Sequence, residues 1–337
     1  MGTSRFFALR PGPAHRIQSG SGIAFTVMSK LALPSPFPLI GRRLDATAHR
    51  MLQPPGSFPV DFGAPKGEPA LVAADSVSWR IFKNPVSLFI GGVTAVILEL
   101  ADPGVREGVW RHSAFRQNPV ERMQRTGLAA MVTVYAPKSV ACSMIARVVR
   151  LHDKINGDLP DGESYRANDP ALLSWVQATA MYGFSQAYNE YVRHLDGEAL
   201  DALCREAQPA ARLYGATAAP TSQRDMDEMF EAMYGRLENS PVIFEFLKIM
   251  RAAPALPMFV RPLQPMLIRA AVDLVPEWMR EHLGLTPDCG LRPWEKPIVY
   301  QAARAADRIV LPSSPAVQSC LRLGLPADYL YRNRQLT

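Results

Sequence analysis

The segment from residue 138 to residue 156 carries a histidine at a spacing suited to metal or haem-iron ligation. Its apolar positions and the histidine follow one another at intervals of 4, 3 and 4, at Ala141, Ile145, Val148 and His152. Side chains at these intervals lie on one face of a helix. A neutral imidazole on a buried face suits a metal or haem iron. A histidine on such a face is, however, more often a core residue with a satisfied hydrogen bond.

Basic residues flank this histidine on the other side of the same helix. Arg147, Arg150 and Lys154 follow one another at intervals of 3 and 4. A guanidinium offers a planar fork to a carboxylate, and haem propionates are carboxylates. The same pattern is equally typical of a solvated helix face.

Motifs of several other chemistries are absent from the sequence. It contains no phosphate-binding GxxxxGK[ST] or GxGxxG loop, no HExxH pair and no GxSxG elbow. The four cysteines are far apart and form no CxxC pair, which argues against a zinc site and fits a reducing compartment. They are Cys142, Cys204, Cys289 and Cys320.

The formal net charge of +6 lies in the amino-terminal part of the chain. Residues 1–60 hold seven basic residues against one acid, Asp45, so the remaining chain is balanced. We therefore expect no nucleic-acid surface on the folded part. The basic segment fits an organelle transit segment, a leader before a natural start at Met28, or a peripheral anchor over residues 37–52. Docking of residues 37–52 on the chain's own domain is the favoured interpretation.

The remaining pattern predicts an all-α fold. Residues 1–70 form a basic, Pro/Gly-rich extension and linker, 71–325 a single large helical domain, and 326–337 a tail. Strict two-residue alternation is absent, so no strand is expected. The longest apolar run, 86–101, is interrupted by Glu99 and is too short to span a membrane, so we interpret it as a buried core helix. Predicted helices cover residues 75–82, 85–99, 118–134, 137–156 (ended by Gly157), 170–191, 197–213, 221–237, 241–252 and 265–275, with one or two more within 291–323.

Several segments together carry a resemblance to a known family. They are SVSWR (76–80), NP followed by GG (84–92), ADPGVREGVWRHSAF (101–115), NPVERMQRT (118–126), RVVRLHDKINGDLPDGESYRANDPALLSWVQAT (147–179) and the proline-broken apolar segment after Pro254. From Trp79 to about Leu285 the chain resembles the MpaB-type oxygenases and the catalytic domain of rubber oxygenase, the latex-clearing protein. The run from His152 to Trp175 is the most specific part.

The resemblance implies an all-α domain that buries a non-covalent b-type haem between its helices. It makes His152, in the pattern H-x4-G with Gly157, the proximal iron ligand. Propionate contacts would come from Arg147, Arg150 and Arg166. Trp175 and Thr179, one helical turn apart, either line the haem pocket or simply pack in the core.

Two positions depart from the family pattern. Rubber-cleaving members carry a Lys-Thr pair on the distal side of the haem, and Arg125 and Thr126 stand at these positions. A guanidinium essentially cannot deprotonate to ligate iron, so Arg125 would instead donate hydrogen bonds to dioxygen, while Thr126 orients dioxygen or the substrate. Asp102 stands where many members carry histidine. His112 is expected to make a structural hydrogen bond.

The sequence thus predicts a cytoplasmic, haem b-dependent oxygenase. Its partners would be dioxygen and a hydrophobic, isoprenoid-like substrate whose C=C bond is cleaved, with peripheral membrane contact left open. The segment 254–275 would form a substrate channel or a cover over the haem helices. Two alternatives remain: a haem enzyme of another type, such as a peroxidase-like tailoring oxygenase, and a non-catalytic helical haem carrier or lipid-binding protein.

Overall fold

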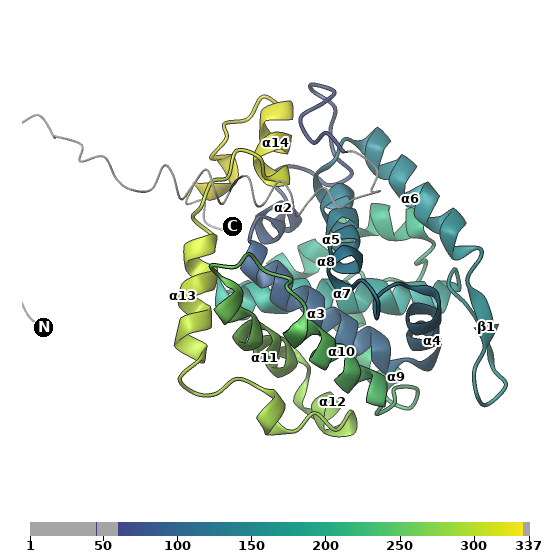
Figure 1. The fold of residues 1–337 in the computed structure, drawn as a ribbon. Coiled ribbons are helices and arrows are strands. Elements are labelled where there is room, and N and C mark those ends of the chain that lie inside the picture. The colour runs from purple at the N-terminus through teal and green to yellow at the C-terminus, as the bar shows by residue number, and fades with distance from the viewer. Residues whose placement is uncertain (1–44, 46–59, 333–337) are drawn as a thin grey trace, which may run out of the picture. The chain divides into compact units, whose positions relative to one another are not determined.

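The computed structural model describes Asp45 and residues 60–332, all within one compact unit. Apart from Asp45 and residue 60, the predictions made above for residues 1–60 concern a part of the chain that the structure does not describe. The described chain is mostly helical, which confirms the all-α prediction (Figure 1). Its α-helices are α2 (Val77–Phe82), α3 (Pro85–Ala101), α4 (Pro103–His112), α5 (Pro119–Tyr135), α6 (Lys138–His152), α7 (Pro170–Tyr191), α8 (Gly197–Tyr214), α9 (Gln223–Met233), α10 (Pro241–Ala252), α11 (Gln264–Leu274), α12 (Glu277–His282), α13 (Lys296–Ala306) and α14 (Pro315–Arg322).

Helices α3 and α7 form the centre of the core. They approach so closely at Gly91 and Gly183 that a Cβ atom on Gly91 would lie 2.5 Å from the Gly183 carbonyl oxygen. Two glycines without side chains are what permits this backbone-to-backbone contact. Gly91 of the GG pair therefore serves close packing of the two helices.

The start of helix α3 is fixed by a capping residue and a proline. The Asn84 side chain accepts hydrogen bonds from the backbone N–H groups of Val86 and Ser87, at 3.0 and 3.1 Å, and Pro85 occupies the first helical position. Much of α3 is buried, which confirms the predicted core helix over 86–101. Among the described helices none is long and apolar enough to cross a membrane alone, whereas α3 and α4 together pass by length and composition but are bent by 109°.

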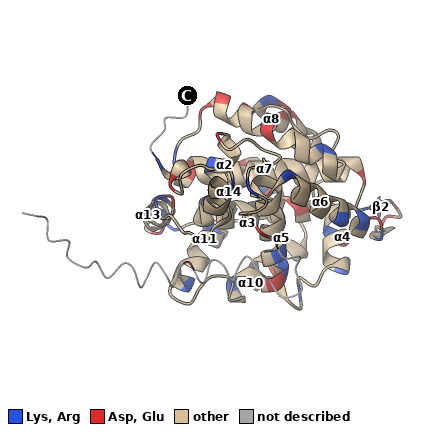
Figure 2. Ribbon diagram, turned by 90° about the horizontal axis from the view of Figure 1, so that it is seen from above, with Lys and Arg blue, Asp and Glu red and all other residues tan. Residues whose placement is uncertain are grey.

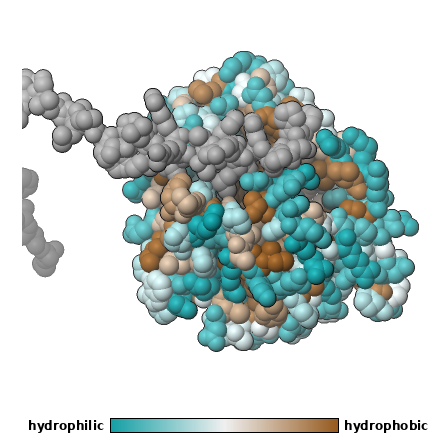
Figure 3. Space-filling model, in the orientation of Figure 1, coloured by the Kyte–Doolittle hydropathy of each residue, from teal (hydrophilic) through white to brown (hydrophobic). Residues whose placement is uncertain are grey.

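The surface mixes polar and apolar residues. In Figure 3 the hydrophobic residues of this face lie in separate patches among hydrophilic ones. Two of the most exposed large apolar side chains, Met258 and Phe259, lie in the proline-broken segment and are 82% and 56% exposed. The same segment then enters α11, where Leu267 and Ile268 are buried. It thus combines a surface loop with a core helix.

The helix boundaries agree closely with the sequence-based ones, but two helices were missed. α4 begins at Pro103, directly after its cap at Asp102, and α12 is a single short element after Pro276. Both are short, and α4 has few buried residues, so neither carries the apolar periodicity that reveals a helix. Three short 3₁₀ turns, η1 (Arg261–Leu263), η2 (Pro287–Cys289) and η3 (Tyr329–Tyr331), join the helices.

The prediction that the chain contains no strand was wrong for the loop after α6. β1 (Asn156–Asp158) and β2 (Ser164–Arg166) form a short antiparallel hairpin. The predicted left-handed helix cap at Gly157 is also wrong, because α6 already ends at His152. Gly157 instead pairs with Tyr165 across the hairpin, where a Cβ atom would lie 2.9 Å from the tyrosine oxygen. Glycine is needed here for room against an aromatic ring.

A second, smaller core joins the two ends of the described chain to the helical body. Arg322 of α14 is 1% exposed, and its guanidinium donates to the carbonyl oxygens of Phe62, Glu68 and Tyr135 at 2.6 to 2.8 Å. These bonds satisfy a charge that would be costly to bury alone. Leu330 of η3 is buried in the same cluster.

Candidate functional site

Helix α6 carries His152 as its last residue. Ala141 and Ile145 are buried, so the predicted inward face of this helix is confirmed for them. The His152 ring is half-buried, and its Nδ1 atom is buried without a hydrogen-bond partner. The Oδ1 atom of Asn168 is buried and unpartnered as well. An imidazole N–H and an amide oxygen are natural counterparts, and Asn168 acts on the pKa of His152 as a neighbouring hydrogen-bonding side chain.

The surroundings of His152 favour its neutral form. Burial lowers the pKa of His152, and the positive charge of Arg122 lowers it further, while Asn168 and Asp153 act in the opposite direction. Its Nε2 atom takes part in no hydrogen bond with the described residues and is not fully buried. A neutral ring with its proton on Nδ1 has a free lone pair on Nε2.

Arg122 of α5 connects His152 electrostatically with an acid on α3. Burial lowers the pKa of Arg122, and the carboxylate of Glu99 opposes this shift. Burial likewise raises the pKa of Glu99 to about 7, against the effects of Arg122 and of the Thr179 hydroxyl. Both Glu99 and Arg122 nevertheless retain some accessible surface. The charges of Glu99 and Arg122 thus oppose the desolvation of one another.

Thr126 stands one helical turn after Arg122. Its hydroxyl donates to the Arg122 backbone carbonyl at 2.9 Å and accepts a hydrogen bond from the Arg122 guanidinium. The next residue, Gly127, has nothing within 4 Å of the place where a Cβ atom would stand. Thr126 therefore joins the same cluster through Arg122, and both Thr126 and Gly127 are exposed at the surface of α5.

Arg125 lies at the surface beside this cluster, and its charge lowers the pKa of Arg122. Its side chain is 50% exposed and forms an ion pair with Glu121 of the same helix at 2.5 Å. An exposed pair four residues apart on a helix contributes only a few tenths of a kcal/mol. Thr126 thus contacts Arg122 directly, whereas Arg125 acts on Arg122 only through its charge.

The three arginines expected to bind propionates are exposed. Arg147 and Arg150 lie on α6 and Arg166 ends β2, and none pairs with an acid among the described residues. Figure 2 shows Lys and Arg residues along α6. Unpaired guanidiniums are available to carboxylates.

Trp175 and Thr179 are both buried on α7, at 1% and 0% exposure. The Trp175 ring packs against Phe230 with centroids 5.1 Å apart, and its Nε1 atom has no hydrogen-bond partner. The Thr179 hydroxyl donates to the Val176 carbonyl at 2.9 Å and also acts on the Glu99 carboxyl. Thr179 thereby joins the cluster, whereas Trp175 packs in the core beside it.

A comparison with protein families matches residues 79–308 to the family described as ER-bound oxygenase mpaB/B'/Rubber oxygenase, catalytic domain. The chain belongs to this family. The match covers most of the chain and confirms the resemblance noted from the motifs. It begins at Trp79, as expected, and continues through α13. No curated protein and no solved structure matches the chain.

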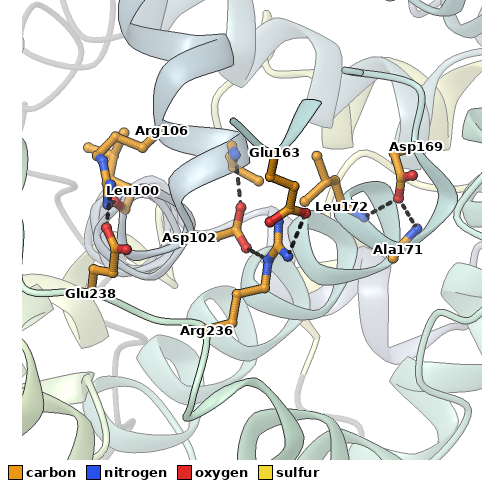
Figure 4. A network of polar contacts seen from close by, with 10 residues as sticks. Leu100, Asp102, Arg106, Glu163, Asp169, Ala171, Leu172, Arg236 and Glu238 are labelled. Carbon is orange, nitrogen blue, oxygen red and sulfur yellow. Dashed lines mark hydrogen bonds and ion pairs between the residues drawn. The ribbon is translucent and has the colours of Figure 1, made fainter. Parts of the chain in front are cut away.

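In this oxygenase the departure at Asp102 has a structural explanation. Asp102 is fully buried and caps α4 by accepting a hydrogen bond from the Val105 N–H at 2.9 Å. Its other oxygen pairs with Arg236 at 2.5 Å, and Arg236 reaches Glu163 of the hairpin at 3.2 Å (Figure 4). Asp102 thus joins α4, the hairpin and the segment after α9.

His112 is likewise placed as expected for a structural hydrogen bond. It ends α4, is exposed, and its Nε2 atom lies 3.3 Å from the Tyr165 hydroxyl. This contact links α4 with β2. His112 has no place in the cluster around His152.

Sequence reasoning missed three members of this oxygenase's candidate site, namely Glu99, Arg122 and Asn168. Glu99 is the one acid within an otherwise apolar run, and Arg122 stands four residues before Thr126 within the NPVERMQRT motif. A lone charge in a core helix and a second arginine at helical spacing were the available signals. Asn168, between YRA and DP, carried no signal of this kind.

A cavity of about 660 Å³ lies elsewhere, between the end of α7 and α13. None of its lining residues belongs to the cluster around His152. The cluster around His152 and this cavity are therefore two distinct features of the described chain.

Proposed function

We propose that this oxygenase is haem b-dependent and uses dioxygen to cleave a C=C bond in a hydrophobic, isoprenoid-like substrate. The observation that carries the haem assignment is His152, whose burial favours the neutral imidazole and whose Nε2 forms no hydrogen bond with the described residues, within the catalytic domain of the family. A single histidine suits a porphyrin iron because the macrocycle supplies four of the metal's ligands.

The residues present fit such a group. His152 would hold the iron through Nε2, while Asn168 would keep the proton on Nδ1, as second-layer partners of ligating histidines commonly do. Arg147, Arg150 and Arg166 would bind the propionates. Trp175 and Thr179 would line the pocket from α7.

The bound group supplies the oxygen-activating chemistry, and the protein controls access and hydrogen bonding around it. Thr126, held through both of its hydrogen bonds to Arg122, would orient dioxygen or the substrate. Arg125 keeps its proposed role only if it leaves Glu121 and turns toward the site. Glu99 carries a carboxyl with a pKa of about 7, so it can hold or release a proton near neutral pH.

An apolar substrate is supported by the exposed Met258 and Phe259 beside the core helix α11. They would receive the chain at the protein surface, in keeping with the proposed channel over residues 254–275. The proposal that a C=C bond is cleaved rests on the rubber oxygenases, which the description of the family names. A cytoplasmic location remains a prediction, and the family's description includes ER-bound members.

The first experiment tests the iron ligand. The full chain, purified and supplied with haemin, should show an intense visible haem band. His152→Ala should lose this band and regain it with added imidazole, which replaces the missing ligand. His112→Ala, an exposed histidine outside the cluster, should retain it. A wild-type protein that takes up no haemin, or a His152→Ala variant with an unchanged spectrum, would overturn the haem assignment.

The second experiment tests the reaction. The haem-loaded protein is incubated with a polyprenyl substrate under air, and oxygen uptake is measured together with carbonyl-bearing fragments by mass spectrometry. One dioxygen consumed for each cleaved bond, with two carbonyl ends formed, is the expected result. Oxygen-dependent products with an intact carbon chain would show another kind of haem oxygenase, and a stable six-coordinate spectrum without turnover would show a carrier.

A further inference from the structure

A second candidate site lies at the other end of α7. It is a surface cavity of about 660 Å³ that is open to solvent, since most of its lining residues are exposed, and its volume falls within the range of small-molecule sites, roughly 300–1,000 Å³. Two segments form it, the carboxyl end of α7 with the residues that follow, and one face of α13 with Pro293 before it. Its lining residues are Asn189, Glu190, Arg193, His194, Pro293, Lys296, Pro297, Tyr300, Gln301 and Arg304.

The cavity has an excess of positive charge. Three cations, Arg193, Lys296 and Arg304, stand against a single carboxylate, Glu190. That carboxylate is already engaged, because Tyr300 donates a hydrogen bond to it and Lys296 pairs with it at 3.0 Å. Both contacts lower the pKa of Glu190, so it stays ionised at neutral pH. The lining therefore keeps a net charge of about two positive units.

The two guanidiniums are free to bind a ligand. Neither Arg193 nor Arg304 forms an ion pair with a described acid. Arg304 instead lies over the Tyr300 ring, 5.3 Å from its centroid, and the Lys296 ammonium lies 5.8 Å from the same centroid. The hydrogen bond from Tyr300 to Glu190 holds this ring in place. Unpaired guanidiniums that line a cavity suit bidentate binding of an oxyanion.

This cavity is separate from the proposed haem site. Thr179 and Asn189 stand ten residues apart on α7, which corresponds to about 15 Å along the helix axis. No residue assigned to oxygen chemistry lines the cavity. A substitution that abolishes binding at one site therefore allows binding at the other site to be measured on its own.

We infer that this cavity binds the phosphate group of a small molecule. The net charge of the lining matches that of a phosphate dianion, and two guanidiniums and one ammonium provide the donors that phosphate oxygens accept. Pro293 and Pro297 also line the cavity, and they offer apolar contact to the organic part of a soluble phosphate ester or to the chains below a phospholipid headgroup.

The experiment compares an oxyanion with its neutral analogue. Calorimetric titration of the full chain with phenyl phosphate should show binding, and phenol under the same conditions should not. Arg193→Gln combined with Arg304→Gln should weaken phenyl phosphate binding by about a hundredfold, about tenfold for each charged hydrogen bond that is lost. Arg308→Gln, an exposed arginine outside the cavity, should bind as the wild type does.

A vesicle arm distinguishes the two sources of phosphate. Co-sedimentation is measured with phosphatidylcholine vesicles, with and without phosphatidic acid. Binding that requires phosphatidic acid and is lost in the double variant identifies a lipid headgroup, and binding of phenyl phosphate alone identifies a soluble ester. The inference is overturned if neither probe binds, or if the double variant, with an unchanged circular dichroism spectrum, binds as the wild type does.

Discussion

Gly91 of α3 and Gly183 of α7 meet backbone to backbone at the centre of this oxygenase. A Cβ atom on Gly91 would stand 2.5 Å from the carbonyl oxygen of Gly183, and one on Gly183 would stand 2.3 Å from that of Gly91. Because α3 carries Glu99 and α7 carries Thr179, this contact also sets the distance between two members of the candidate site.

Gly91→Ala should therefore destabilise the protein. The added methyl group meets backbone, which cannot rotate away, so we expect a loss of about 1–3 kcal/mol in the free energy of unfolding. Denaturant titration measures this change. Gly92→Ala is the matched control, since its nearest contact would be a side-chain atom of Phe184 at 3.8 Å. Equal stabilities of the two variants would contradict the close approach.

Asp102→Ala should cost about 2–4 kcal/mol of stability. It removes the cap of α4 and leaves the Arg236 guanidinium without its buried partner. Arg224→Gln breaks an ion pair in which both side chains are exposed, so its unfolding free energy should change by less than about 0.5 kcal/mol. If thermal and denaturant unfolding show the same loss of stability for the two variants, the structural role assigned to Asp102 is wrong.

Glu99 should make stability depend on pH. Its pKa of about 7 in the folded protein lies above the ordinary value of 4.5, so the folded state holds more protons between these values. Stability from this group is therefore present below pH 4.5 and is lost as the pH rises through 7. The loss is about 1–3 kcal/mol, reduced from the full shift because Glu99 retains some exposure.

Glu99→Gln should abolish this part of the pH dependence. Unfolding free energies measured between pH 5 and pH 8 should then decline less for the variant than for the wild type. Glu121→Gln, an acid of the exposed pair with Arg125, should preserve the wild-type slope. Parallel curves for wild type and Glu99→Gln would show that Glu99 titrates normally.

Arg122 should affect turnover more than Arg125. The Arg122 guanidinium is desolvated and hydrogen-bonded to Thr126, whereas that of Arg125 pairs with Glu121 at the surface. We expect Arg122→Lys to lower oxygen uptake by about tenfold, the equivalent of about 1.4 kcal/mol, and Arg125→Lys to change it by less than about threefold. The visible spectrum of each variant controls for haem content. The reverse ranking would support the assignment of Arg125 made from the family motif.

Local signals in the sequence predicted most helices well. Asp169 and Pro170 mark the start of α7, and the Asp169 side chain accepts hydrogen bonds from Ala171 and Leu172 as a cap should. The same logic failed at Gly157, because a glycine can serve a turn, a cap or a close contact, and only the position of Tyr165 distinguishes them.

The candidate site was predictable in part. His152 could be placed on an inward helix face because helical periodicity depends only on residues near one another in the chain. Arg122, Glu99 and Thr179 come from three different helices, so their convergence depends on how α3, α5 and α7 pack. Arg125 shows the limit of a motif, since neighbouring positions on a helix face directions about 100° apart.

The family, the all-α fold and the proposed iron ligand thus follow from the order of residues along the chain. They depend on motifs, caps and periodicity, which are local properties. The partners of Asp102, the raised pKa of Glu99 and the phosphate-sized cavity between α7 and α13 follow from long-range packing. Burial and electrostatic interaction act through space, so residues distant in the sequence set them.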